Sequence, residues 1–126
     1  MRETKYWTWF ILAGAAIFVL LGLHMITMHL DSIVGWFNPA GGSPIDWQNV
    51  VERAKFAISS TLYVLLLGAA LYHGLYGFRT VLFELNLSVG GQRFINRLFW
   101  TVGLALFVYG SWVAVKFQMI SQATQV

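Results

Sequence analysis

The chain has 126 residues, of which 58% are hydrophobic and only 10% are charged, and its mean hydropathy is +0.66. This composition excludes an ordinary water-soluble globular domain, in which about 25% of residues are charged. The formal charge of +3 comes from eight scattered basic residues that form no patch, so nucleic acid is not an expected partner. Because the chain has no cysteine, it holds no disulfide and no iron-sulfur cluster through its own thiolates.

Three stretches without a charged residue are long enough to cross a bilayer as helices. They run from Tyr6 to Leu30, from Phe56 to Phe78 and from Leu98 to Val115, and contain 25, 23 and 18 residues. A hydrocarbon core of about 30 Å takes roughly 20 helical residues. The sequence therefore predicts an all-α integral membrane protein. We expect one transmembrane domain over residues 1–126 with three transmembrane helices at about 6–30, 56–84 and 94–117.

The first predicted helix begins with aromatic residues that are typical of a membrane interface, namely Tyr6, Trp7, Trp9 and Phe10. Its apolar run is longer than the roughly 7 to 15 residues of a signal-peptide core, and no small-x-small cleavage pattern follows it. We therefore expect this segment to be retained as a helix.

A long loop and a short amphipathic helix are predicted next. Asn38-Pro39 and Gly41-Gly42 are turn signals, and Ser43-Pro44-Ile45-Asp46 is typical of a helix start with Ser43 as the N-cap. A helix from Pro44 has Trp47, Val50 and Val51 on one side and charged residues on another. We expect it to lie along the outer interface of the membrane before the second span begins.

The ends of the remaining spans and the basic residues predict the topology. Asn86 and Gly90-Gly91 predict the end of the second span and the turn before the third. Five basic residues fall on one side of the predicted spans (Arg2, Lys5, Arg79, Arg93 and Arg97) and three on the other (Arg53, Lys55 and Lys116). The positive-inside rule then predicts a multi-pass protein of the cell inner (plasma) membrane, with a cytoplasmic N-terminus and the C-terminus on the outer side.

Four ionisable side chains in or near the predicted spans are functional candidates: His24, His73, Arg79 and Glu84. Ionisable groups inside a membrane are rare and are usually functional. In a chain without cysteine, the two histidines indicate a haem site or a proton path, and the alternative is that they only make hydrogen bonds between helices. His29 lies nearer to a span boundary.

The residues after His73 have both a functional and a structural interpretation. Gly77 follows His73 by one helical turn, where it allows a flat porphyrin to lie close or only allows helix packing. Arg79 is a candidate partner of a haem propionate or a charge that only sets the topology. Glu84 is an acid on the quinone side of the site or merely a solvated helix end.

The depths of the two histidines predict that they do not share a haem. His24 lies six residues from the outer end of its span and His73 five residues from the inner end of its own, which is roughly 9 Å and 8 Å deep. In a core of about 30 Å they are then on the order of 13 Å apart along the membrane normal. Since two axial ligands flank one iron, each histidine needs a second ligand from another chain, or one of the two histidines is not a ligand.

The pattern His73-x-x-x-Gly77-x-Arg79, with Glu84 after it, resembles the second-helix motif of the hydrophobic anchor (cytochrome b) subunits of succinate dehydrogenase and fumarate reductase. The segment 20–25, Leu-Leu-Gly-Leu-His-Met, resembles the first-helix histidine of the anchors that carry two haems. The resemblance implies that His73 and His24 are axial ligands of haem b iron. It places His73 on the haem nearer to the flavin and iron-sulfur subunits and His24 on the distal haem.

The same resemblance implies a function and a set of partners. The chain would be a non-catalytic anchor, with an anchor-like helical bundle, that passes electrons between an iron-sulfur subunit and membrane quinone or menaquinone. One or two b haems would be shared with a second hydrophobic anchor subunit, and a flavoprotein subunit would complete the complex in the lipid bilayer.

Two departures from the family pattern concern the quinone site. The first span has no His-Arg-x-Ser-Gly-like element, and Leu85 follows Glu84 where small anchors often have tyrosine. We therefore expect a partner anchor to supply most of that site. Two other functions stay open: a cytochrome b subunit of another membrane redox complex, such as a hydrogenase or formate dehydrogenase, and a haem-free structural or assembly subunit.

Overall fold

The computed structural model describes residues 2–29 and 41–124. Within these ranges it contains four helices, α1 (Arg2–His29), α2 (Trp47–Ala54), α3 (Ala57–Phe83) and α4 (Val89–Ala123). The helices α1, α3 and α4 are each long and apolar enough to cross a membrane. This confirms the prediction of an all-helical protein with three candidate spans.

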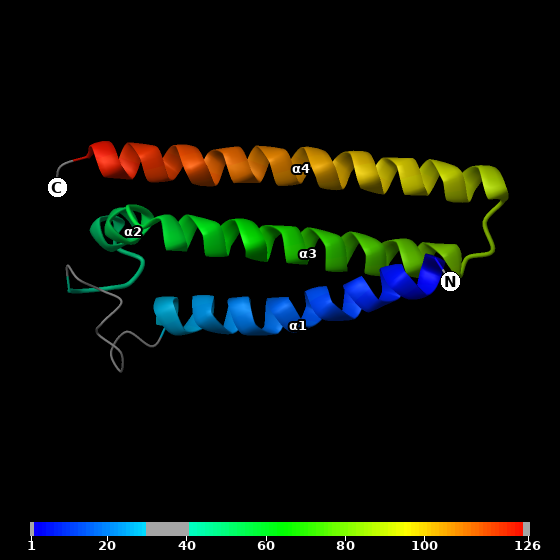
Figure 1. Cartoon of the computed structure of the whole chain (residues 1–126), viewed down its shortest axis with the longest axis horizontal. Helices are drawn as coiled ribbons and strands as arrows, with labels where there is room; N and C mark the ends of the chain where they lie inside the picture. The colour runs from blue at the N-terminus through cyan, green and yellow to red at the C-terminus, as the bar shows by residue number, and fades with distance from the viewer. Residues whose placement is uncertain (1, 30–40, 125–126) are drawn as a thin grey trace.

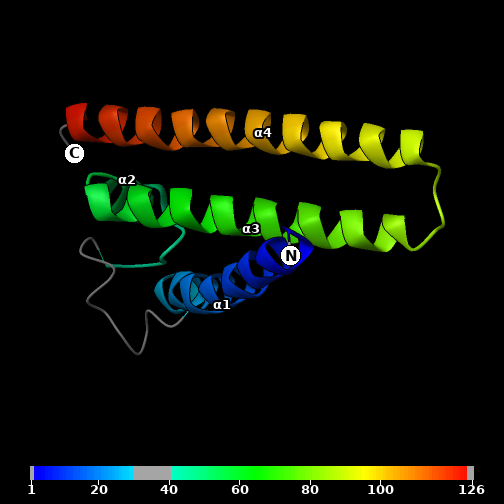
Figure 2. The ribbon, with the colours of Figure 1, turned by 45° about the vertical axis from the view of Figure 1, so that its right-hand side comes forward.

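The helix α3 is central among the three long helices. Both α1 and α4 pack against α3 and flank it, running antiparallel to it (Figure 1). Figure 2 shows that α1 is inclined to α3, whereas α4 runs alongside α3. The start of α1 and the turn between α3 and α4 lie at one end of the molecule, and α2 lies at the other end with the end of α4.

The three long helices leave most of their large apolar side chains exposed. Among the described residues only Val51 and Ala54 are buried hydrophobic residues, and both belong to α2. Phe18 is 84% exposed and Trp100 66% exposed. A surface this apolar is suited to lipid, where the helices satisfy their backbone groups internally.

The boundaries of α1 and α4 differ from the prediction. The helix α1 begins at Arg2 rather than near Tyr6, and its predicted end at Leu30 lies outside the described residues. The helix α4 continues to Ala123, well past the predicted end near Phe117. Hydropathy locates the part of a helix that contacts lipid, and both helices extend beyond that part into the interface.

The turn between α3 and α4 is also shorter than predicted. Gly90 and Gly91 belong to the first turn of α4 and not to the loop, because the Ser88 side chain accepts a hydrogen bond from the Gly91 amide at 3.2 Å and caps the helix. The predicted role of Asn86 in the turn is confirmed, since its φ of 53° lies in the left-handed region. The bounds of α3 agree with the predicted range 56–84 to within one residue at each end.

The predicted amphipathic helix is present as α2, but Ser43 is not its N-cap. Asp46 is the N-cap residue, because Ser43 and Asp46 close a separate turn ahead of the helix. In this turn the Ser43 amide donates to Asp46 Oδ2 at 2.9 Å and the Asp46 amide donates to the Ser43 carbonyl at 3.0 Å. The fully buried Asn49 donates to the carbonyls of Gly41 and Ser43 at 2.8 and 3.0 Å, which holds the turn against α2.

Contacts with α4 hold α2 at the end of the helical layer. The rings of Trp47 and Phe117 lie 5.9 Å apart, and the Gln122 side chain donates to the Lys55 carbonyl at 3.0 Å. These contacts lie where α3 begins and α4 ends, the level at which an interfacial helix is expected.

Glycines set the spacing between α3 and α4. A Cβ atom on Gly103 would lie 2.8 Å from Leu75 Cδ1, and one on Gly110 would lie 2.5 Å from Leu67 Cδ2. On α3, a Cβ on Gly68 would lie 3.1 Å from the Phe107 ring. Because lipid removes the hydrophobic drive between helices, such small-residue contacts carry much of the packing energy.

The substitution Gly110→Leu is expected to lower stability, since the new side chain meets Leu67. Overpacking of this kind costs about 1–3 kcal/mol. Gly22→Leu is the matched control, because no atom lies within 4 Å of a Cβ there and the helix-propensity gain of about 1 kcal/mol is the same. Denaturant titration in detergent measures both, and adding Leu67→Ala to Gly110→Leu is expected to restore part of the loss. Equal stability of the two glycine variants would contradict this account of the packing.

Candidate functional site

His73 extends from α3 toward α1. Its imidazole stacks on the Phe10 ring, with centroids 4.1 Å apart and an interplanar angle of 4°, and its Nδ1 lies 3.0 Å from the Phe10 carbonyl oxygen. A carbonyl only accepts hydrogen bonds, so Nδ1 is the donor in this contact, and in the neutral imidazole Nε2 then has the lone pair. Metal-ligating histidines commonly have this arrangement, in which the other ring nitrogen donates to a backbone carbonyl.

Two glycines make room for this contact. A Cβ on Gly14 would lie 3.0 Å from His73 Cε1 and 3.2 Å from Nδ1, and a Cβ on Gly77 would lie 3.1 Å from Phe10 Cε2. Gly77 and His73 thus lie on one face of α3, and Phe10 covers both. A flat porphyrin could take the position over Gly77 only if the Phe10 ring turned away.

His24 lies on α1 toward the other end of the same interface and faces α3. Its ring makes an edge-to-face contact with Tyr63, with centroids 5.7 Å apart at 74°. Its Nδ1 is buried and has no hydrogen-bond partner among the residues that the structure describes. Leaving a buried polar atom unpaired costs about 1–3 kcal/mol, so this position favours a group that supplies the missing contact.

The two histidines occupy different levels of the α1–α3 interface. His73 is level with Phe10 and Gly14, whereas His24 is level with Tyr63, which precedes His73 on α3 by ten residues. Ten helical residues span about 15 Å. This agrees with the separation expected from the sequence, and it prevents the two rings from flanking one iron.

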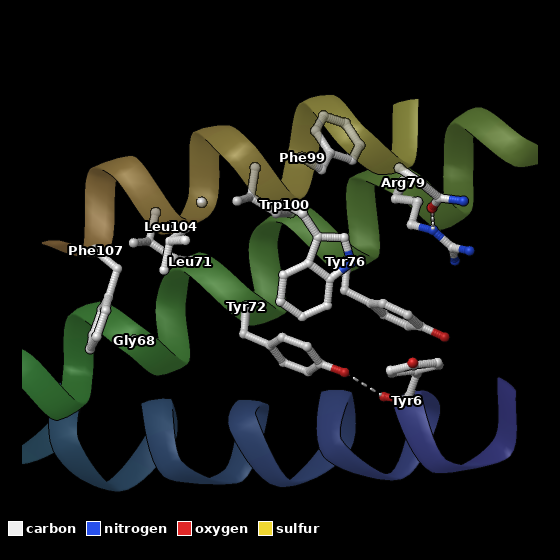
Figure 3. Close-up of a pocket in the computed structure, with 13 residues that line it drawn as sticks. Tyr6, Gly68, Leu71, Tyr72, Tyr76, Arg79, Phe99, Trp100, Leu104 and Phe107 are labelled. Atoms are coloured by element: carbon white, nitrogen blue, oxygen red, sulfur yellow. Dashed lines mark hydrogen bonds between the residues drawn. The ribbon is translucent and has the colours of Figure 1, made fainter. Parts of the chain in front are cut away.

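Arg79 connects α3 to α4 near the inner end predicted for α3. Its guanidinium carbon lies 4.2 Å from the Phe83 ring centroid and 5.5 Å from that of Tyr76, and its Nε donates to Asn96 Oδ1 on α4 (Figure 3). Glu84 is the C-cap residue of α3 and is exposed to solvent. The structure therefore places Arg79 between helices and Glu84 outside the packed region.

A groove of about 610 Å³ lies between α3 and α4 (Figure 3). We call it the α3–α4 groove. Thirteen residues line it: Tyr6, Gly68, Leu71, Tyr72, Leu75, Tyr76, Arg79, Asn96, Phe99, Trp100, Gly103, Leu104 and Phe107. The Tyr72 hydroxyl donates to the Tyr6 carbonyl at 3.0 Å, and the rings of Tyr72 and Tyr76 stack with centroids 5.7 Å apart. Of the predicted site residues, only Arg79 lines this groove.

Several residues that contact the predicted site residues or line the groove were not identified from the sequence. The run Ala13-Gly14-Ala15-Ala16 was a signal of close helix approach, and the spacing of Tyr72 and Tyr76 was a signal of a shared face. No signal pairs Phe10 with His73, because that contact depends on how α1 is rotated against α3.

The donor set of this chain fits a haem better than a metal held by side chains alone. Among residues 2–29 and 41–124, no three His, Cys, Asp or Glu side chains gather at one place. A haem iron takes four ligands from its porphyrin and needs only axial ligands from protein, so one histidine per chain is sufficient.

Comparisons with protein-family models, with curated proteins and with solved structures give no match to this chain. The geometry described above is therefore the basis of the functional interpretation.

The substitution Gly14→Val is expected to displace the His73 ring from the Phe10 carbonyl and to shift the imidazole toward the Nε2-protonated tautomer. Ala15→Val is the matched control, since Ala15 is an exposed neighbour on α1. The ¹⁵N chemical shifts of histidine in the haem-free chain in lipid vesicles report the tautomer directly. An identical Nδ1-protonated signal in wild type and Gly14→Val would show that this contact does not set the tautomer.

Proposed function

We propose that this chain is a haem b-binding membrane-anchor subunit of a succinate:quinone oxidoreductase, either a succinate dehydrogenase or a fumarate reductase. It would pass electrons between an iron-sulfur subunit and membrane quinone without making bonds itself. The observation that carries the proposal is the hydrogen bond from His73 Nδ1 to the Phe10 carbonyl inside a candidate span. It leaves Nε2 with a lone pair, as axial ligation requires.

The residues of this chain would bind and tune the cofactor. His73 is the proposed axial ligand of one haem and His24 that of a second, and the haem supplies one-electron transfer when bound. The hydrogen bond from His73 to Phe10 orients the imidazole ring. Arg79, held by Asn96 and two aromatic rings, is the proposed partner of a propionate, and Gly77 leaves space beside His73 once Phe10 moves.

The proposed partners follow from the levels of the two histidines. Since His24 and His73 lie about 15 Å apart along the interface, each haem needs an axial ligand from elsewhere. The chain has three histidines, and α4 contains none of them. We therefore propose a second anchor subunit that completes both coordination shells and an anchor-like bundle. Iron-sulfur and flavoprotein subunits would bind at the cytoplasmic end, nearer to His73.

The proposed quinone site depends mainly on the partner anchor. Glu84 remains a candidate on the quinone side, but it is exposed and does not line the α3–α4 groove. A quinone headgroup near Glu84 would therefore need walls from other subunits.

A haem-free structural subunit is the second candidate function. It is favoured by the Phe10 ring, which already covers His73 and Gly77, so that His73 joins α3 to α1 without any cofactor. In that case the same hydrogen bond would serve helix association only. A cytochrome b subunit of a different redox complex shares the haem chemistry and differs only in its partners.

The substitution His73→Ala in the purified complex is expected to abolish the b-type absorbance of one haem, because the iron loses an axial ligand. His24→Ala is expected to remove a different part of the absorbance. His29→Ala is the matched control, as the third histidine is exposed at the end of α1 and should leave the spectrum intact. Reduced-minus-oxidised spectra measure all three.

The outcomes separate the candidates. An unchanged spectrum in His73→Ala would remove the haem proposal and favour the structural subunit. An unchanged spectrum in His24→Ala would reduce the number of haems to one. Succinate:quinone reductase activity of the wild-type complex distinguishes the proposed family from other cytochrome b complexes.

A further inference from the structure

The α3–α4 groove has a polar end and an apolar end. Polar groups gather at the Arg79 end, where the Arg79 side chain donates to Asn96 and lies beside the Tyr76 ring, and where the Tyr72 hydroxyl donates to the Tyr6 carbonyl (Figure 3). Toward Gly68 the lining is hydrocarbon, from Leu71, Leu104 and Phe107. From Arg79 to Gly68 the groove extends for eleven residues of α3, or about 16 Å. Its long axis follows the helices, so its polarity changes along the membrane normal.

A ligand that matches this change of polarity along the groove must be an amphiphile, with its polar head at the Arg79 end. The volume of about 610 Å³ lies within the usual range of about 300–1,000 Å³ for small-molecule sites. The groove also opens to lipid, as Trp100 and Leu104 are 66% and 62% exposed. A membrane lipid can therefore enter it sideways from the bilayer.

The charge distribution favours an anionic head. Five of the eight basic residues belong to the end of the molecule that contains Arg79, together with only two acidic residues, Glu3 and Glu84. All other acidic residues fall between α1 and α3 in the sequence and are balanced by the three remaining basic residues. The residues that give the net charge of +3 thus belong to the end of the molecule that contains Arg79. Positive charge near the head region attracts anionic lipids.

The lining also distinguishes a lipid from a reacting quinone. Quinone reduction requires protons, and among the residues whose side chains the structure describes no carboxylate or imidazole lines the α3–α4 groove. Tyrosine hydroxyls donate and accept hydrogen bonds. Phosphate and ester oxygens accept such hydrogen bonds without any reaction.

We infer that the α3–α4 groove binds an anionic phospholipid, with its phosphate among Arg79, Tyr76 and Asn96 and one acyl chain along Leu71 and Leu104. This site shares Arg79 with the proposed haem site, where it is the proposed partner of a propionate, but it does not include His73, which faces α1 and does not line the groove. A bound lipid would fill the side of α3 that its helical neighbours leave open.

Photo-crosslinking of the full chain in its complex tests this inference. The complex is reconstituted in phosphatidylcholine vesicles that contain phosphatidylglycerol with a diazirine in one acyl chain, and the labelled residues are identified by mass spectrometry. We expect labelling of residues 68–79 and 96–107 on the groove side. The same diazirine on phosphatidylcholine is expected to label them several-fold less, because the head is not anionic.

The substitution Leu104→Trp is expected to fill the groove and to reduce its labelling several-fold. Leu106→Trp is the matched control, since Leu106 is a lipid-exposed leucine on the same helix that does not line the groove. Leu71→Trp blocks the groove from α3 and gives a second test if Leu104→Trp fails to fold, which circular dichroism detects. His73→Ala is expected to remove haem and to leave the lipid labelling intact. Failure of the haem proposal can therefore be distinguished from failure of the lipid proposal.

Three results would overturn the inference. Equal labelling around Leu104 and Leu106 would show a general lipid surface, and equal labelling by the two head groups would show that charge plays no part. Labelling of the groove by an azido-quinone that excess phosphatidylglycerol does not displace would identify a quinone site instead.

Discussion

The structure depends on close backbone approach between helices that lipid does not push together. In hydrocarbon, exposed leucine and phenylalanine are as stable on the lipid face as in an interface, so packing depends on shape. The helix α3 is approached from α4 at Gly103 and Gly110, where a Cβ atom would collide with a leucine of α3, and from α1 at Gly14, where a Cβ atom would lie 3.0 Å from the His73 ring. Removing side chains at these positions gives three spans a defined arrangement without a buried apolar core.

The hydrogen bond between His73 and Phe10 has two physical effects at once. It joins α3 to α1 within the span, and it assigns the ring proton to Nδ1. The same hydrogen bond therefore associates the two helices and prepares His73 for metal ligation. For this reason a structural and a redox interpretation both begin from this contact. In the redox interpretation Nε2 binds the haem iron and the Phe10 ring turns away. In the structural interpretation the Phe10 ring stays over the histidine. His24 adds a second imidazole at another level, and its buried Nδ1 has no hydrogen-bond partner in the part of the chain that the structure describes.

Much of the fold follows from the sequence because bilayer thickness sets the length of each apolar run. The three spans and α2 were predicted, as was the different depth of His24 and His73, since depth is obtained by counting residues along a helix. Helix ends were less predictable: the Ser88 cap brings Gly90 into α4, and Asp46 replaces Ser43 as N-cap.

The contacts around the candidate site were largely not predictable. Phe10 and His73 are 63 positions apart, and their contact depends on the rotation and tilt of α1 against α3. The α3–α4 groove depends in the same way on how two helices face each other. A single sequence gives the composition of each helix face but does not state which faces meet. The predicted residue Arg79 was found at the rim of this groove, while Glu84 was found apart from it.

The central position of α3 has a consequence for biogenesis. Because Phe10, Gly14 and His73 all belong to α1 and α3, the nascent chain has every residue of this contact before the ribosome has translated α4. A helical hairpin of α1 and α3 therefore contains every residue of the contact between His73 and Phe10. The helix α4 packs against another side of α3 and forms the α3–α4 groove with it.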